Sequence, residues 1–159
     1  RQMCIRDRSG ADQSLRVWDL ESGSLIRSLN QHTKPVNALR LRPIKGGLPM
    51  VASAARDKTI RFWQPTIGRM VRYIRLDSEP LNIAWTSDGD RILATCVDGR
   101  LRVINPIEVT VTNDLPAIDG WAYAIAVHPN HHSAAIGGIN GQIRRIENLF
   151  ARETKIETR

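Results

Sequence analysis

Asp57-Lys-Thr-Ile-Arg-Phe-Trp63 is the stretch of sequence that decides the fold. Its residues alternate by side, with Ile60 and Phe62 on one face and Arg61 and Trp63 on the other. Alternation with a period of two is typical of a β-strand, because successive side chains point to opposite faces. The aspartate that opens the stretch favours a tight turn. The stretch therefore predicts a turn followed by a strand.

The same pattern occurs three more times along the chain. In each copy an Asp or Asn stands six residues before a large apolar residue, and an Arg stands two before it. The other copies are Asp12-Gln-Ser-Leu-Arg-Val-Trp18, Asp98-Gly-Arg-Leu-Arg-Val-Ile104 and Asn140-Gly-Gln-Ile-Arg-Arg-Ile146. Their last residues are 45, 41 and 42 positions apart. This period predicts propeller blades, each built of four short antiparallel strands.

Further short strands are predicted between the copies, separated by turn signals such as Ser87-Asp-Gly and His128-Pro-Asn. They are expected at Ser24–Leu29, Val36–Leu41, Met50–Ala54, Met70–Leu76, Leu81–Trp85, Arg91–Thr95, Glu108–Thr112, Tyr123–Val127 and Ala134–Gly137. A convincing helical period is missing, except for the charged end after Asn148. The sequence therefore predicts an all-β fold, a partial β-propeller of about three and a half blades.

The expected propeller region is 9–147, with blades at roughly 9–30, 34–76, 80–114 and 120–147. Residues 148–159 are expected to be a charged tail or the start of the next strand. Residues 1–8 have no strand period and resemble a translated sequencing adapter, so we expect a non-native scar there. Because three and a half blades cannot close a ring, the remaining blades are expected in a longer chain.

Two of the copies resemble a known family closely. Leu15-Arg-Val-Trp-Asp19 and Ile60-Arg-Phe-Trp-Gln64 are similar to the third-strand signature of WD-repeat proteins, and the resemblance covers roughly Ser9–Ile146. In the second repeat it implies a hydrogen-bonded tetrad formed by His32, Ser53, Asp57 and Trp63. The carboxylate would fix the imidazole, which would pass a bond through the serine to the indole N–H that a buried Trp must satisfy.

The other repeats depart from this pattern. Ile104 and Ile146 stand where the tetrad has its tryptophan, and an isoleucine offers no hydrogen-bond donor. The turn acid is kept as Asp98 but is replaced by the neutral Asn140 in the last copy. We therefore expect absent or partial tetrads in the later blades. In the first copy, Asp12 is the turn acid, and the serine position falls within the suspected scar.

The sequence favours binding over catalysis. Asp12, Asp57 and Asp98 recur once per blade, which indicates structural turn acids instead of a paired catalytic site. The His128-Pro-Asn-His-His132 motif is more consistent with a solvated turn than with a metal site, because no cysteine or acid accompanies it at ligand spacing. Cys96 is expected to be a small buried side chain. No enzyme activity, cofactor or metal is predicted.

The charge of +7 raises the question of an anionic partner. One arginine recurs per blade on the third strand, and the set is Arg16, Arg61, Arg102 and Arg144. The simpler interpretation is that their stems pack over neighbouring side chains, and the alternative is a basic stripe for nucleic acid. Nucleic-acid binding is disfavoured because only 5% of residues are aromatic. No apolar run is long enough to span a membrane.

The resemblance implies that a protein or peptide partner docks on one end of the blades. With the strands of a blade lettered a to d, this face is made by the d–a loops and b–c turns. The matching candidates are Lys34, Arg56, Glu79 and Trp121. Trp121 is either an exposed anchor or tucked between blades. The expected function is a protein–protein interaction scaffold, with an accessory or sensor propeller of a larger multidomain enzyme as the alternative and a nucleic-acid-binding surface as the second alternative.

Overall fold

The structure, a computed structural model, describes residues 12–43, 46–130 and 132–150. These residues form thirteen β-strands in four antiparallel sheets, with one 3-10 turn, η1 (Ile139–Gly141). The all-β prediction is therefore confirmed. The suspected scar at 1–8 and the end of the chain at 151–159 lie outside the described residues, so the expectations for them stay predictions.

Each sheet is a meander in which neighbouring strands are consecutive in sequence. The first sheet pairs β1 (Leu15–Trp18) with β2 (Leu25–Leu29). The second has the order β3 (Val36–Leu41), β4 (Val51–Ala55), β5 (Thr59–Gln64) and β6 (Arg69–Arg75). The third has the order β7 (Pro80–Trp85), β8 (Ile92–Cys96), β9 (Arg100–Asn105) and β10 (Thr110–Pro116). The fourth has the order β11 (Ala122–Val127), β12 (Ser133–Gly138) and β13 (Ile143–Glu147).

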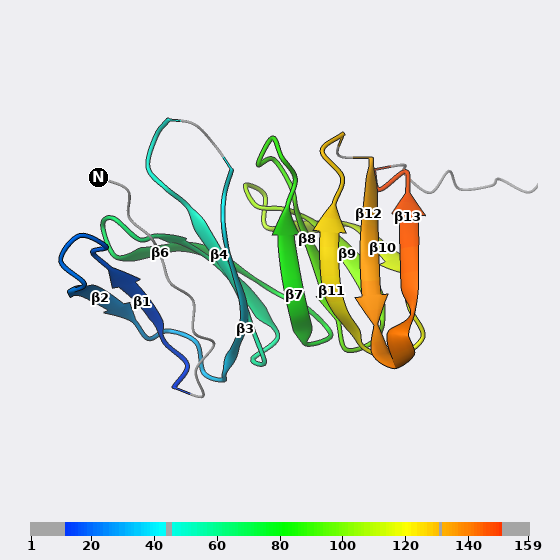
Figure 1. The fold of residues 1–159 in the computed structure, drawn as a ribbon, viewed down its shortest axis with the longest axis horizontal. Helices are drawn as coiled ribbons and strands as arrows, with labels where there is room; N and C mark the ends of the chain where they lie inside the picture. The colour runs from blue at the N-terminus through cyan, green and yellow to red at the C-terminus, as the bar shows by residue number, and fades with distance from the viewer. Residues whose placement is uncertain (1–11, 44–45, 131, 151–159) are drawn as a thin grey trace, which may run out of the picture.

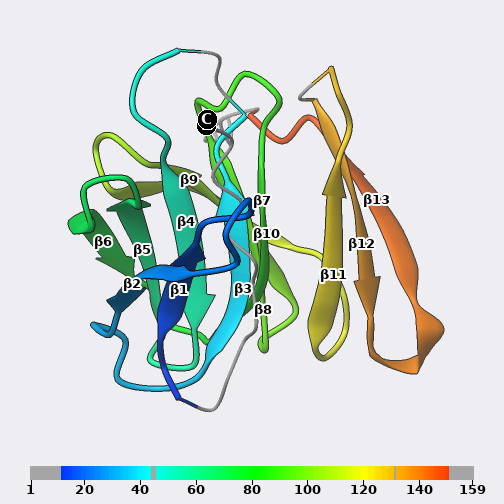
Figure 2. The same cartoon turned by 60° about the vertical axis from the view of Figure 1, so that its left-hand side comes forward.

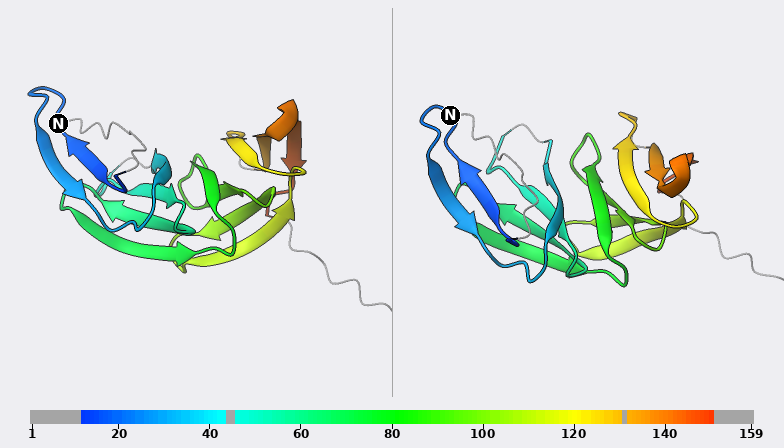
Figure 3. Two further views of the ribbon diagram at one scale, coloured as in Figure 1. Left: turned by 90° about the horizontal axis from the view of Figure 1, so that it is seen from below. Right: turned by 60° about the horizontal axis from the view of Figure 1, so that its bottom comes forward.

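The sheets stand side by side and fan out along an arc (Figures 1 and 2). Strands β3, β7 and β11 lie along the concave side of the arc, while β6 and β10 lie on the convex side (Figure 3). This is the arrangement of propeller blades around an axis, with strand a innermost. We refer to the four sheets as blades 1 to 4 in chain order.

The core lies between neighbouring blades, because central strands such as β4 and β8 bury apolar or small side chains on both of their faces. One cluster joins blades 2 and 3 through Ile60, Phe62, Ile83 and Ile92, which are at most 1% exposed. Equivalent clusters join blade 1 to blade 2 and blade 3 to blade 4. Such burial on both faces explains why β4 and β8 contain almost only apolar and small residues.

The expected strand d of blade 3 was wrong at both ends. Glu108 and Val109 were included in the strand, but Val109 takes a positive φ of 58° and closes the c–d turn, so β10 begins at Thr110. At the other end the strand was expected to stop at Thr112, yet β10 continues to Pro116. Proline lacks an N–H, and an edge strand tolerates that loss because one side of it needs no partner.

The loops between the strands gather at two opposite ends of the blades. The d–a loops and b–c turns lie along the lower side of the molecule in Figure 1, while the a–b loops form its upper edge. Because each blade is a meander, its c–d turn lies at the same end as its a–b loop. The lower side is the face that the sequence analysis singles out for a partner. Across the described ranges, no helix is long and apolar enough to cross a membrane.

Candidate partner-binding face and the network beneath it

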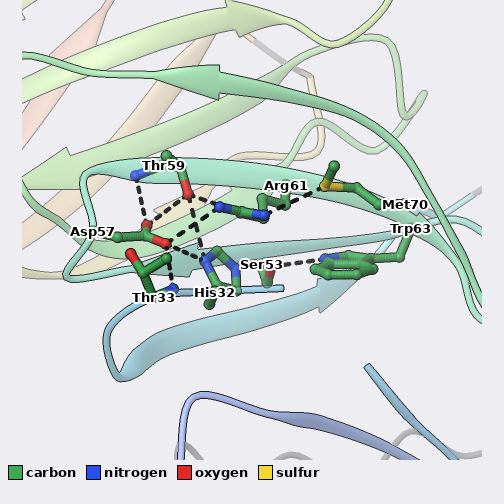
Figure 4. Close-up of polar contacts among 8 residues, drawn as sticks. All are labelled: His32, Thr33, Ser53, Asp57, Thr59, Arg61, Trp63 and Met70. Carbon is green, nitrogen blue, oxygen red and sulfur yellow. Dashed lines mark hydrogen bonds and ion pairs between the residues drawn. The ribbon is translucent and has the colours of Figure 1, made fainter. Parts of the chain in front are cut away.

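The four tetrad residues of blade 2 meet beneath the partner face (Figure 4). Trp63 Nε1 lies 2.8 Å from Ser53 Oγ, and Ser53 Oγ lies 2.7 Å from His32 Nε2. His32 Nδ1 lies 2.9 Å from Asp57 Oδ2. All four residues are buried. The network joins strands β4 and β5 to the d–a loop and the b–c turn.

The direction of the hydrogen bonds follows from the donors available. An indole N–H can only donate, so Ser53 Oγ accepts from Trp63 and uses its own hydrogen to donate to His32 Nε2. His32 Nε2 is then the acceptor of a neutral imidazole, and Nδ1–H donates to the carboxylate of Asp57. Each buried polar group in the network therefore has a partner, which avoids the cost of unsatisfied burial.

Asp57 receives more bonds than the tetrad alone requires. The hydroxyl of Thr59 donates to Asp57 Oδ1 at 2.6 Å and the Thr59 amide at 3.0 Å, while the Thr33 amide donates to Oδ2 at 3.1 Å. An Arg61 nitrogen lies 3.6 Å from the same carboxylate. These contacts were not predicted from the sequence, although an Asp followed two residues later by Thr is a signal for such a turn.

The charged state of this network depends on pH. Burial by itself raises the pKa of Asp57, but hydrogen bonds from Thr59, His32 and Thr33 outweigh it and lower the pKa from 3.8 to about 2. Burial lowers the pKa of His32 below 6.5, even though Asp57 opposes that shift. Both groups therefore bind protons more weakly in the folded chain than in the unfolded chain.

Acid is expected to destabilise the fold in two stages. Because the pKa of His32 is lower in the folded chain, the stability that neutral His32 contributes falls as the pH drops below about 6.5. The stability that ionised Asp57 contributes is fully present above about pH 4 and is lost as the pH falls towards 2. The Asp57 part amounts to about 2 kcal/mol. Denaturant midpoints measured from pH 7 to pH 2 check this. Asp57→Asn should flatten the profile below pH 4, and an unchanged slope there would contradict the role of Asp57.

The turn acids of the other blades bind an arginine on the following strand. Asp12 pairs with Arg16, and Asp98 pairs with Arg102, at 3.1 Å and 2.6 Å. With Arg61 beside Asp57, three of the four strand-c arginines face an acid four residues earlier. In blade 4, where Asn140 carries no charge, Arg144 donates to the carbonyl of Ala117 instead, at 3.2 Å.

The exposure of the strand-c arginines differs from blade to blade. The side chains of Arg61 and Arg102 are only 14% and 5% exposed, whereas Arg16 is 43% exposed and Arg144 is also exposed, so only Arg61 and Arg102 are withdrawn from a basic stripe. The acids and the arginines were predicted as separate features. Their constant spacing of four in each copy was the signal that could have joined them.

The four candidate partner-binding residues differ in their exposure and in the bonds that they make. Lys34 is exposed. Arg56 and Glu79 are paired with each other across blades 2 and 3, with Nε 3.5 Å from Oε1. Glu79 also accepts from Asn37 Nδ2 at 3.0 Å and is 27% exposed. Glu79 therefore ties two blades together, in addition to facing solvent.

Trp121 lies at the surface of blade 4, the last blade that the structure describes. Its side chain is 47% exposed and packs edge-on against Tyr123, with ring centroids 5.8 Å apart. Tyr123 is itself 46% exposed and was missed, because its place in strand a gave no sign that it would face outwards. The sequence analysis thus named one half of an exposed aromatic pair.

The loop before Trp121 is held firmly against blade 3. The amides of Ala117 and Ile118 both donate to the carbonyl of Gly99, at 3.1 Å and 2.9 Å. A Cβ on Gly99 would lie 1.9 Å from the Ile118 oxygen, so only glycine permits this approach. Gly99 also has a φ of +74°, which other residues rarely adopt. Trp121 is therefore carried by a loop whose backbone position is fixed.

The described histidines of the His128-Pro-Asn-His-His132 motif and the thiol of Cys96 lie in surroundings that do not favour metal binding or catalysis. Over the described part of the chain, no three His, Cys, Asp or Glu residues lie close enough to hold a metal ion. His128 and His132 are exposed, and His131 lies outside the described residues. Burial raises the pKa of the Cys96 thiol to about 12, so it stays protonated at neutral pH and is a poor nucleophile.

Comparison with known proteins agrees with the blade topology. The WD40 family profile (WD domain, G-beta repeat) matches residues 23–64, which include β2 to β5. Coronin-7 of Rattus norvegicus is 30% identical over 120 residues, or 70% of this chain. The periodic tryptophan protein 2 homolog of Dictyostelium discoideum is 31% identical over 65% of the chain, and the WD repeat-containing protein srw1 of Schizosaccharomyces pombe is 23% identical over 85%.

This chain spans only a small part of each relative: 12% of Coronin-7, 11% of the periodic tryptophan protein 2 homolog and 25% of srw1. The matches concern repeats and do not extend to whole proteins. Together with the antiparallel four-stranded blades and the buried network of blade 2, they identify the repeats that this chain contains. The chain is a WD-repeat protein.

Proposed function

We propose that this chain is a non-catalytic scaffold that binds a protein or peptide partner through its d–a loops and b–c turns. WD40 repeats point to a protein-interaction module. The observation that carries the proposal is Trp121, a large aromatic side chain left 47% exposed on a loop whose backbone is fixed. A protein gains nothing in stability by exposing such a side chain, whereas an interface gains most from aromatic anchors.

Rigidity is the second property that supports this proposal. Asp57 binds both the amide of Thr33 and the ring of His32, which ties the d–a loop to the b–c turn. The Arg56 amide also donates to the carbonyl of Pro35 at 2.9 Å. Because these loops are already ordered, a partner would not have to order them on binding, and less binding energy would be lost.

The other three candidates lie on blades 2 and 3 at the same end of the blades as Trp121. Lys34 carries an exposed positive charge, and Arg56 and Glu79 present one charge of each sign at the edge of blades 2 and 3. Exposed pairs of this kind contribute little affinity, but they favour one orientation of the partner over others. We expect Trp121 and Tyr123 to supply affinity and these three residues to supply selectivity.

Trp121→Ala is expected to weaken partner binding about thirtyfold, the effect of removing an interface hot spot. The partner is unknown, so the probe is a set of peptides selected from a random displayed library against the unaltered chain. Affinities of the selected peptides would be measured by titration for both forms of the chain.

Tyr73→Ala is the matched control, because Tyr73 is 52% exposed but lies on the outer strand β6. It should leave affinity for the selected peptides unchanged. Melting temperatures of both variants would show that the fold is intact. Peptides that bind Trp121→Ala as tightly as the unaltered chain would place the binding surface elsewhere.

A further inference from the structure

Arginines of strand d join blade 1 to blade 2 and blade 2 to blade 3 at their outer rims. Arg27 on β2 donates from Nη2 to the carbonyl of Thr66, at 3.0 Å. Arg72 on β6 donates from Nη1 to the carbonyl of Ile107, at 2.7 Å, with the Pro106 carbonyl at 3.5 Å. In both cases the acceptor is a backbone carbonyl in the c–d turn of the next blade.

The two arginines occupy the same place in successive blades. Arg27 is the register partner of Val17 on β1, and Arg72 is the register partner of Phe62 on β5. Val17 and Phe62 are themselves equivalent, since each directly precedes the tryptophan of its repeat. The contact therefore recurs with the repeat, and a chance surface contact would not.

The acceptors explain why the contact survives changes in the turn sequence. The turns differ in residue type, with Thr66-Ile-Gly68 in blade 2 and Ile107-Glu-Val109 in blade 3. They share a backbone shape, because Gly68 and Val109 both have positive φ and both donate to the residue four positions earlier, at 2.9 Å. An arginine that donates to a backbone carbonyl requires only this turn conformation and no particular side chain in the turn.

The side chains that join neighbouring blades differ in length between the inner and the outer strands. At the inner rim the donor is a short amide: Asn37 donates to the carbonyl of Pro80 at 2.9 Å, and Asn82 donates to that of Tyr123 at 3.0 Å. At the outer rim the donor is the longer side chain of an arginine. Arg27 lies directly over the turn, since a Cβ on Gly68 would be 2.9 Å from its Nη1.

We propose that Arg27 and Arg72 are inter-blade clamps that hold the outer rims of blades 1 and 2 to the c–d turn of the following blade. Between blades 2 and 3, Arg72 at the outer rim and Asn37 at the inner rim together fix the angle between the two sheets. The inference goes beyond the proposed partner binding, because it concerns the opposite end of the blades and holds whether or not a partner exists.

The test is hydrogen exchange at single amides in Arg72→Met, which keeps the length of the side chain but removes its donors. The Val109 amide closes the turn that Arg72 holds, and its exchange should rise about tenfold because that turn opens locally. The Gly68 amide in the preceding turn should be unaffected. Arg27→Met should give the reverse result, with faster exchange at Gly68 and no change at Val109.

Arg75→Met is the matched control, since Arg75 is an exposed arginine on the same strand whose register partner is Thr59. It should leave both amides unchanged. Equal exchange at Val109 in the Arg72 and Arg75 variants would overturn the proposal, and so would a uniform rise through all blades. If Arg72→Met does not fold, Arg72→Lys keeps the charge with a shorter reach, and it should still accelerate Val109 more than Gly68.

Discussion

Trp63→Ala is expected to lower the free energy of unfolding by about 3–5 kcal/mol, the cost of truncating a large buried aromatic side chain. Trp63 is 1% exposed and packs in the cluster that joins blades 1 and 2. The truncation leaves a cavity and also removes the donor to Ser53, which is completely buried. Domains are typically stable by only about 5–15 kcal/mol, so this single change would remove much of the margin.

Two further variants separate the parts of this loss. Trp63→Phe retains most of the volume but lacks the indole N–H, so it should cost about 1–3 kcal/mol for the donor that Ser53 Oγ loses and for the imperfect fit. Ile146→Val changes the equivalent position of blade 4, where no network exists, and should cost about 0.5–1.5 kcal/mol. Denaturant unfolding measures all three. A neutral Trp63→Ala would show that the network does not stabilise the fold.

The parts of the structure that depend on local sequence patterns could be predicted. The repeat of a turn acid, an alternating strand and a large apolar residue is local, and it predicted the blades and strand β3 with its bounds. The tetrad was predictable through the family resemblance, because its four residue types stand at recognisable places in one repeat. Local patterns were sufficient wherever a residue's partner lies within its own repeat.

Contacts between blades could not be predicted in the same way. Arg72 meets Ile107 and Glu79 meets Arg56 only because the sheets stack, and the sequence separations follow no fixed motif. Side-chain orientation was another limit, since Tyr123 lies in strand a and yet is 46% exposed. Val109 was predicted within a strand, where β-branched residues are common, but the c–d turn holds it at a φ of 58°.

Blade 3 shows how the fold compensates for the missing tetrad. Register places Ala94 where blade 2 has Ser53, since these residues are the partners of Arg102 and Arg61. Ile104 stands in place of Trp63. In both blades an amide of the b–c turn donates to a carbonyl of the d–a loop: Arg56 to Pro35 in blade 2 and Val97 to Glu79 in blade 3. The residue three positions before that carbonyl is His32 in blade 2 and Leu76 in blade 3. The polar residues have been replaced as a set, so no buried donor is left without a partner.

In their place, Arg102 fixes the b–c turn. Its side chain is 5% exposed, binds both carboxylate oxygens of Asp98 and lies 3.5 Å from Asp114 on strand β10. Burial alone lowers the pKa of Arg102, but the Asp98 carboxylate more than reverses that effect. Arg102 thus connects the turn to the outermost strand of its own blade, as Asp57 connects the turn to the d–a loop in blade 2.

Arg102→Met is therefore expected to destabilise the fold by about 2–4 kcal/mol, because it removes a buried charge from its partner and leaves the carboxylate unpaired. The lower part of that range applies if water reaches Asp98, which is 32% exposed. Arg100→Met is the control on the same strand. Arg100 is 39% exposed and pairs with Asp114 at 2.7 Å, so losing it should cost less than about 1 kcal/mol.

A double-mutant cycle tells whether the pair itself is responsible. Asp98→Asn in the Arg102→Met background removes the unpaired charge, so the double variant should be more stable than the sum of the two single losses predicts, by about 1–2 kcal/mol. Chemical denaturation of the four proteins measures this coupling. Strictly additive losses would mean that Arg102 acts only through the packing of its stem, and that blade 3 holds its turn without a charged contact.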